Sequence, residues 1–153
     1  MLGTEAVTEL AARGAELADL ARELGDDDLY HCGAWWVMHS DFRLGDLAAA
    51  DLRLQEISDC SRRAGKPLWE WELLIVRAFR ALLAADLGLA EQWLGRLEEM
   101  DPPRGIDVQS VIGVATFLLR REQGRLASLA PVLRTVVELN PKTALWGPGL
   151  AVL

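Results

Sequence analysis

The feature that most constrains this chain is an internal repeat of about forty residues. Gly25, Gly65 and Gly105 recur at this constant spacing, and each stands between two segments with helical periodicity. A second series lies between them, because LGDLAAA (44–50) matches AADLGLA (84–90) at the same offset, and QGRLASLA (123–130) follows at an interval one residue shorter. Glycine is the usual residue at the left-handed position that ends a helix. The two interleaved series therefore predict a repeating unit made of two helices.

The hydrophobic pattern predicts an all-α fold. Apolar residues recur at steps of three and four, as they do along one face of a helix, and no segment keeps the alternation of a strand. Asp28 and Asp107 stand where they can cap helix starts, and the acidic run 26–28 is interpreted as a solvated capping turn. Pro131 suits a first helical turn. We expect helices over about 4–24, 28–44, 47–64, 68–84, 87–100, 107–123 and 127–139.

Composition limits the class of protein. A length of 153 residues suggests one domain, 1–153, and 51% hydrophobic with 25% charged residues is typical of a globular chain. The net charge of −7 argues against nucleic acid as a partner, because phosphate binding requires a basic surface. No apolar run reaches the roughly 18 residues that a membrane span needs, and no signal peptide is evident. Two cysteines do not make a disulfide framework, so we expect a cytoplasmic protein.

The segment between the paired helices resembles a known family. Gly-Asp-Leu-x-x-Ala at 45–50 resembles the turn of the tetratricopeptide repeat, and 124–141 is similar to that repeat over most of its second helix, with Leu133, Val136 and Pro141 at matching places. The resemblance implies a right-handed superhelix of about three and a half helical hairpins.

The first two units depart from the family pattern. Both are several residues longer than the family's unit, and Asp41 and Ala81 stand where the family has a bulky aromatic residue. Long units of this kind are similar to the tetratricopeptide-like tails of large bacterial regulators, which carry a signal-transduction ATPase, a nucleotide cyclase or a DNA-binding module elsewhere. The resemblance therefore implies the interaction or sensor region of a larger bacterial regulator.

The segment HCGAWWVMHSDF (31–42) concentrates residues that could form a metal or catalytic site. His31 and His39 are eight residues apart, which separates them by about 12 Å along a helix, too far to share one metal ion. We predict no metal, no cofactor and no enzymatic activity, since no catalytic triad or phosphate loop can be assembled. For Cys32 and Cys60 we expect buried free thiols, with a disulfide across the hairpin as the alternative.

The aromatic residues indicate a binding surface. In the repeat register set by Gly45, residues 34, 37, 38 and 44 face the neighbouring hairpin, and 35, 36, 39, 42 and 43 face a concave groove. The same register places 72, 75, 76, 79 and 83 of the next unit, and 114, 118, 121 and 122 of the third, in that groove. The candidate groove residues are Trp35, Trp36, His39, Phe42, Arg43, Glu72, Phe79 and Arg121. A helix buried on two sides would show the same apolar character, so packing alone is the competing interpretation.

Two functions follow from this surface. The first is a module that binds a protein or peptide, since Trp and Arg are frequent interface anchors. The alternative is a sensor that encloses a small apolar effector near Trp35, Trp36 and Phe79. The first helix is interpreted as half of a missing hairpin, and Leu145 and Trp146, with the apolar residues 150, 152 and 153, would be exposed near the other end. We therefore expect a homodimer formed through the ends.

Overall fold

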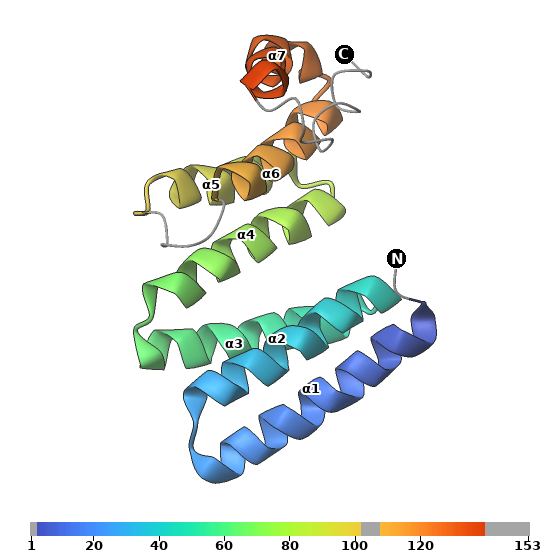
Figure 1. Ribbon diagram of the computed structural model, residues 1–153, viewed down its shortest axis with the longest axis vertical. Helices are drawn as coiled ribbons and strands as arrows, with labels where there is room; N and C mark the ends of the chain where they lie inside the picture. The colour runs from blue at the N-terminus through green and yellow to red at the C-terminus, as the bar shows by residue number, and fades with distance from the viewer. Residues whose placement is uncertain (1–2, 102–107, 140–153) are drawn as a thin grey trace. The chain divides into compact units, whose positions relative to one another are not determined.

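A computed structural model describes residues 3–101 and 108–139 of the chain. The regular structure of these residues is entirely helical, which confirms the all-α prediction (Figure 1). The elements are α1 (Thr4–Leu24), α2 (Asp27–Leu44), α3 (Leu47–Ala64), α4 (Pro67–Leu83), α5 (Leu87–Glu98), α6 (Val108–Glu122), the 3-10 helix η1 (Leu126–Leu129) and α7 (Ala130–Leu139).

The predicted helix boundaries agree with these elements to within two residues, except at the last one. The segment expected as a single helix over 127–139 is divided into η1 and α7. Pro131 lies in the first turn of α7, as expected, where its missing amide hydrogen costs no helical bond. Gly105, the predicted cap Asp107 and the apolar residues of 145–153 lie outside the described residues.

The turns repeat the same backbone conformation every twenty residues from 25 to 85, and again at 124, thirty-nine residues later. Positive φ angles occur at Gly25, Gly45, Gly65, Ala85 and Gly124. At four of the five, 25, 45, 85 and 124, two backbone hydrogen bonds close the helix end in the Schellman pattern, for example from Asp46 N to Asp41 O at 2.9 Å and from Gly45 N to Phe42 O at 3.2 Å. The forty-residue period of the sequence is thus visible in the backbone.

Aspartates follow three of these turns and cap the next helix. The side chains of Asp26, Asp46 and Asp86 accept hydrogen bonds at 3.0 Å from backbone amides in the first turns of α2, α3 and α5. The assignment of the first cap to Asp28 was therefore wrong. Asp28 lies inside α2, and its carboxylate pairs with Lys66 at the start of α4.

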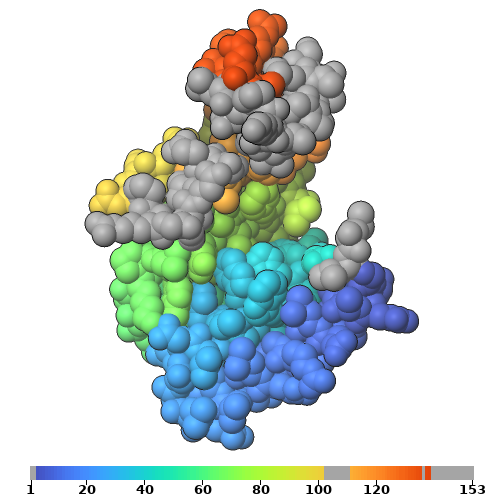
Figure 2. All heavy atoms as spheres, in the orientation of Figure 1, coloured from blue at the N-terminus to red at the C-terminus, as the bar shows by residue number. Residues whose placement is uncertain are grey.

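The chain divides into two compact units, residues 1–73 and 74–153, which we describe separately. In the first unit α1, α2 and α3 lie side by side, and the side chains of α1 and α2 are in contact along the face shown in Figure 2. Met38 and Ile57 are completely buried in its core. Gly14 and Gly33 let α1 and α2 approach closely, because a Cβ atom on Gly33 would lie 2.6 Å from the carbonyl oxygen of Gly14.

The second unit contains the rest of α4 with α5, α6, η1 and α7. Leu74, Leu97 and Leu119 are buried in its core. Arg120 of α6 pairs with Glu91 of α5 at 2.8 Å. None of the helices in the described part of the chain is long and apolar enough to cross a membrane. The single domain, the superhelix and the number of hairpins stay predictions.

Candidate functional site

The centre of the candidate site is a stack of aromatic rings between α2 and the start of α4. The imidazole of His31 is buried and lies parallel to the indole of Trp69, with ring centroids 4.1 Å apart and an interplanar angle of 7°. The indole of Trp35 also stacks with His31, with centroids 5.8 Å apart and an angle of 18°. His31 Nε2 forms a hydrogen bond to Oε2 of Glu72 at 3.1 Å. His31 is therefore held by two rings and one carboxylate.

The stack continues at both ends. Along α2, the ring of His39 meets Trp35 edge to face, with centroids 4.6 Å apart. At the α4 end, the ammonium group of Lys66 lies 4.5 Å from the centroid of the Trp69 ring, a cation–π contact. Three of the predicted groove residues, Trp35, His39 and Glu72, are thus brought together.

The residue that joins them is His31, which the groove register did not include. His31, Trp35 and His39 are spaced by four residues, so they follow one another on the same face of α2. That spacing, visible in the sequence, indicates that the three rings are neighbours on α2. It does not indicate the contact with Trp69, because that contact depends on where α4 packs.

Burial affects the ionisation of one member of this cluster, His39. It lowers the pKa of His39 below its ordinary value of 6.5, and the nearby carboxylate of Glu72 opposes this shift. The second ring nitrogen of His31, Nδ1, is buried without a hydrogen-bond partner among the described residues, and so is Nε1 of Trp71. His31 and Trp71 are forty positions apart, so they occupy the same position in successive repeats of the sequence.

The other predicted groove residues differ in exposure. Trp36 is 45% exposed, Phe42 is half-buried and Arg43 is exposed, all on α2. Phe79 and Arg121 belong to the second unit, where Phe79 is half-buried and Arg121 is exposed. The first unit therefore brings Trp35, His39 and Glu72 together, and the last two residues lie in the other unit.

Three related expectations were wrong. Ile75 and Val76 were expected to line the groove, but both are buried. Leu44 was expected to pack against a neighbouring hairpin, but it lies in the last turn of α2 beside the glycine that ends the helix, and it is exposed.

The cysteines are both free, and only Cys60 is buried as expected, while Cys32 is exposed. The Cys60 thiol donates a hydrogen bond to Oδ1 of Asp27 at 3.5 Å. Burial, together with the negative charge of Asp27, raises the pKa of Cys60 to about 11. Since the thiolate is the reactive form, Cys60 is a poor nucleophile at neutral pH.

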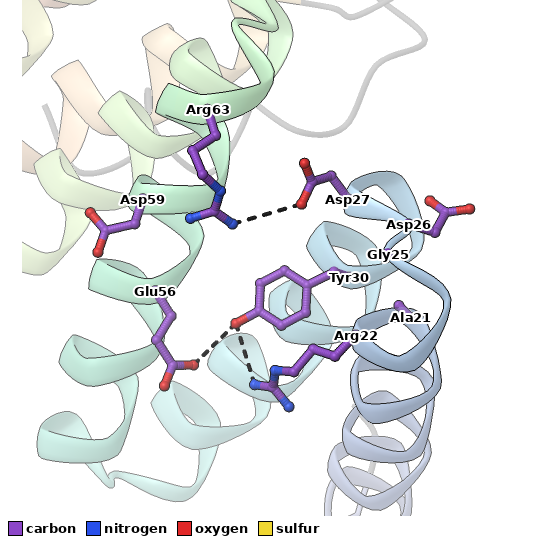
Figure 3. Close-up of a pocket in the computed structure, with 9 residues that line it drawn as sticks. All are labelled: Ala21, Arg22, Gly25, Asp26, Asp27, Tyr30, Glu56, Asp59 and Arg63. Atoms are coloured by element: carbon purple, nitrogen blue, oxygen red, sulfur yellow. Dashed lines mark hydrogen bonds and ion pairs between the residues drawn. The ribbon is translucent and has the colours of Figure 1, made fainter.

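A polar cleft lies elsewhere in the first unit, where α1, α2 and α3 meet (Figure 3). Its volume is about 470 Å³. The hydroxyl of Tyr30 lies between the side chains of Arg22 and Glu56. It donates a hydrogen bond to Glu56 at 3.3 Å and accepts one from Arg22 at 3.4 Å. On the other side, Arg63 pairs with Asp27 at 3.7 Å. These polar side chains form hydrogen bonds and ion pairs with one another, and these contacts link α1, α2 and α3.

The described residues include no group of three or more His, Cys, Asp or Glu side chains placed to hold a metal ion. No family model, no curated protein and no solved structure matches this chain. The tetratricopeptide-like resemblance, and what it implies, stay predictions.

Proposed function

We propose that this chain is a helical-repeat module that binds a protein or peptide through the aromatic face of α2. In this proposal the hairpins form a right-handed superhelix of about three and a half tetratricopeptide-like units. Trp36 is the anchor of the face, and Trp35, His39, Phe42 and Arg43 surround it. The module works in the cytoplasm as the interaction or sensor region of a larger bacterial regulator, without contacting nucleic acid or membrane.

The observation that carries the proposal is the state of two adjacent tryptophans. Trp36 leaves 45% of its surface exposed to solvent, although tryptophan is among the side chains that gain most from burial. Beside it, Trp35 is fixed between His31 and His39. A rigid aromatic side chain loses little conformational entropy when a partner covers it, which favours binding.

A peptide is favoured over an enclosed small molecule by the position of the cavities. Three cavities lined by described residues involve neither Trp35, Trp36 nor Phe79. The aromatic face is a surface on one side of a helix, which suits an extended or helical peptide.

A peptide-display selection on the full chain tests this function. Peptides that bind the unmodified protein should bind the Trp36→Ala variant at least tenfold more weakly, measured by fluorescence anisotropy. Leu52→Ala is the matched control, because Leu52 is 58% exposed on α3, and its binding should not change. Selected peptides that bind both variants as tightly as the unmodified protein would contradict the proposal.

Self-association through the ends is a separate part of the proposal. Repeat units cannot bury their apolar faces alone, so an uncovered end favours association. Sedimentation velocity at protein concentrations up to hundreds of micromolar should show a dimer. A monomer throughout that range would overturn this part and leave the peptide-binding face untouched.

A further inference from the structure

Helices α1 and α3 share two ion pairs at the forty-residue offset of the repeat. The ion pair between Arg13 and Glu16, at 3.0 Å, has its counterpart between Arg53 and Glu56, at 2.8 Å. A second pair on each helix, Asp19 with Arg22 and Asp59 with Arg62, also corresponds, as do the terminal glycines 25 and 65. The helix that packs against α3 therefore indicates which kind of structure can pack against the corresponding surface of α1.

On α3, this surface is covered by α2. The Tyr30 hydroxyl donates a hydrogen bond to Glu56. Asp27 accepts a hydrogen bond from the thiol of Cys60 and forms an ion pair with the guanidinium of Arg63. Ile57, which precedes Cys60 by three residues, is completely buried. Figure 3 shows Tyr30 and Asp27 of α2 pointing toward Glu56 and Arg63 of α3.

The start of α4 continues the same covered surface. Trp69 stacks on His31 of α2, and Glu72 accepts the hydrogen bond of His31 Nε2. Helix α2 thus lies antiparallel to α3 and is held by side chains from α3 and α4 together.

The corresponding surface of α1 and α2 is open among the described residues. We call it the end face and define it by Leu17, Leu20, Leu29 and Cys32, the counterparts of Ile57, Cys60, Trp69 and Glu72. Leu20 is 51% exposed, Leu29 and Cys32 are exposed, and Leu17 is half-buried. Ile57, Cys60 and Trp69 are buried, whereas their counterparts on α1 and α2 are half-buried or exposed.

We propose that the end face binds an amphipathic helix of a partner protein, running antiparallel to α1 as α2 runs antiparallel to α3. This site goes beyond the aromatic face proposed above, because its anchor is Leu20 of α1. Glu16 takes the place of Glu56, so the partner presents a hydroxyl or amine toward it.

Charge specifies the first turn of the partner helix. Where α3 has Arg63 opposite Asp27, α1 has Glu23. The partner therefore carries Lys or Arg where α2 carries Asp27. Two copies of the end face in a symmetric dimer would instead bring both α1 helices, each with five acidic and two basic residues, into one interface. Like charges at an interface disfavour that pairing, so the dimer proposed above forms through the other end of the chain.

The probe that tests this inference is a stapled helical peptide with the sequence of residues 27–44, in which Cys32 is replaced by Ser and the staple lies on the side away from the contact. One version keeps Asp27 and the other carries Asp27→Lys. Fluorescence anisotropy on the full chain should show that the lysine version binds about threefold more tightly, as expected for an exposed ion pair. The protein variant Glu23→Arg should reverse that preference.

Leu20→Glu should weaken binding of the lysine peptide at least tenfold, since it places a charge in the apolar contact. Leu52→Glu, at a leucine of similar exposure on α3, should leave binding unchanged. Circular dichroism checks that each variant is folded, and Leu24→Glu replaces Leu20→Glu if that variant is not, because Leu24 is also exposed on α1.

Alkylation of Cys32 by iodoacetamide gives an independent readout. Cys32 is exposed and lies in the end face, so a saturating concentration of the peptide should slow its modification several-fold. The inference is overturned if the peptide does not bind, if binding survives Leu20→Glu, if Glu23→Arg does not reverse the charge preference, or if Cys32 stays equally reactive. A dimer of the unmodified protein that Leu20→Glu dissociates would overturn it too, because the occupant would then be a second copy. Peptides selected on Trp36 report on the other proposal, so each can fail alone.

Discussion

Ala85 occupies a backbone conformation that glycine fills at the equivalent turns. Its φ angle is 57°, and the corresponding residue one unit earlier is Gly45, with φ 81°. An L-residue in the left-handed region is strained by its Cβ atom, at a cost of about 1–2 kcal/mol. Replacing it with glycine removes this strain, but glycine has more conformational entropy in the unfolded chain, which offsets part of the gain in stability. We expect Ala85→Gly to raise the free energy of unfolding by about 0.5–1 kcal/mol in urea denaturation. Gly45→Ala should lower it by about 1 kcal/mol, and a destabilised Ala85→Gly would show that Ala85 is held by contacts instead.

The burial of His39 makes stability depend on pH. Its pKa in the folded chain is lowered by burial, whereas in the unfolded chain it is about 6.5. Between these two values the unfolded chain binds more protons, so stability rises with pH and is lost as the pH falls below about 6.5. We expect the urea midpoint of unfolding to decrease as the pH is lowered from 7.5 to 5. In the His39→Gln variant this decrease should be smaller. An identical pH profile for both proteins would contradict the role of His39.

The two cysteines should differ in reactivity. Cys32 is exposed, whereas Cys60 is buried with a pKa of about 11. At pH 8 iodoacetamide should modify Cys32 and leave Cys60 almost unmodified, as measured by peptide mass mapping. Urea should expose Cys60 and make it react like Cys32. Rapid alkylation of Cys60 in the folded protein would contradict its contact with Asp27.

At the scale of helices, the crossing of α1 and α2 depends on two glycines. A Cβ atom on Gly33 would lie 2.6 Å from the Gly14 carbonyl oxygen and 2.7 Å from the backbone nitrogen of Ala18. These are backbone atoms, so the helices must move apart, and we expect Gly33→Ala to cost about 1–3 kcal/mol in urea denaturation. Gly95→Ala is the control, because Gly95 lies inside α5 with open space around it. That substitution should stabilise the protein by up to about 1 kcal/mol through helix propensity.

Helix boundaries could be predicted from the sequence because their signals are local. The glycines that end helices and the aspartates that cap them act within four residues, so the forty-residue period located six helices without knowledge of their packing. The candidate site could be predicted only in part. The register placed Trp35, His39 and Glu72 together, but the position of Trp69 against His31 and the exposure of Cys32 depend on which helices become neighbours. A helical wheel shows which residues share a face and does not show what covers that face.

At the scale of the whole molecule, the repeat predicts how instability spreads. If the hairpins stack as proposed, each unit contacts only its neighbours, and a local defect should affect distant units weakly. Met38→Ala should destabilise the first unit by about 2–5 kcal/mol, because Met38 is completely buried there. Hydrogen exchange measured by mass spectrometry should then accelerate over α2 and α3, while amides of α6 keep their rates.

Leu119→Ala is the matched variant in the second unit, since Leu119 is as fully buried in α6 as Met38 is in α2. It should accelerate exchange over α5 and α6 and leave α1 unchanged. Equal acceleration over all helices by either substitution would mean that the chain unfolds as one cooperative body. That result would contradict a repeat array, in which stability is a sum of units and of the contacts between neighbouring units.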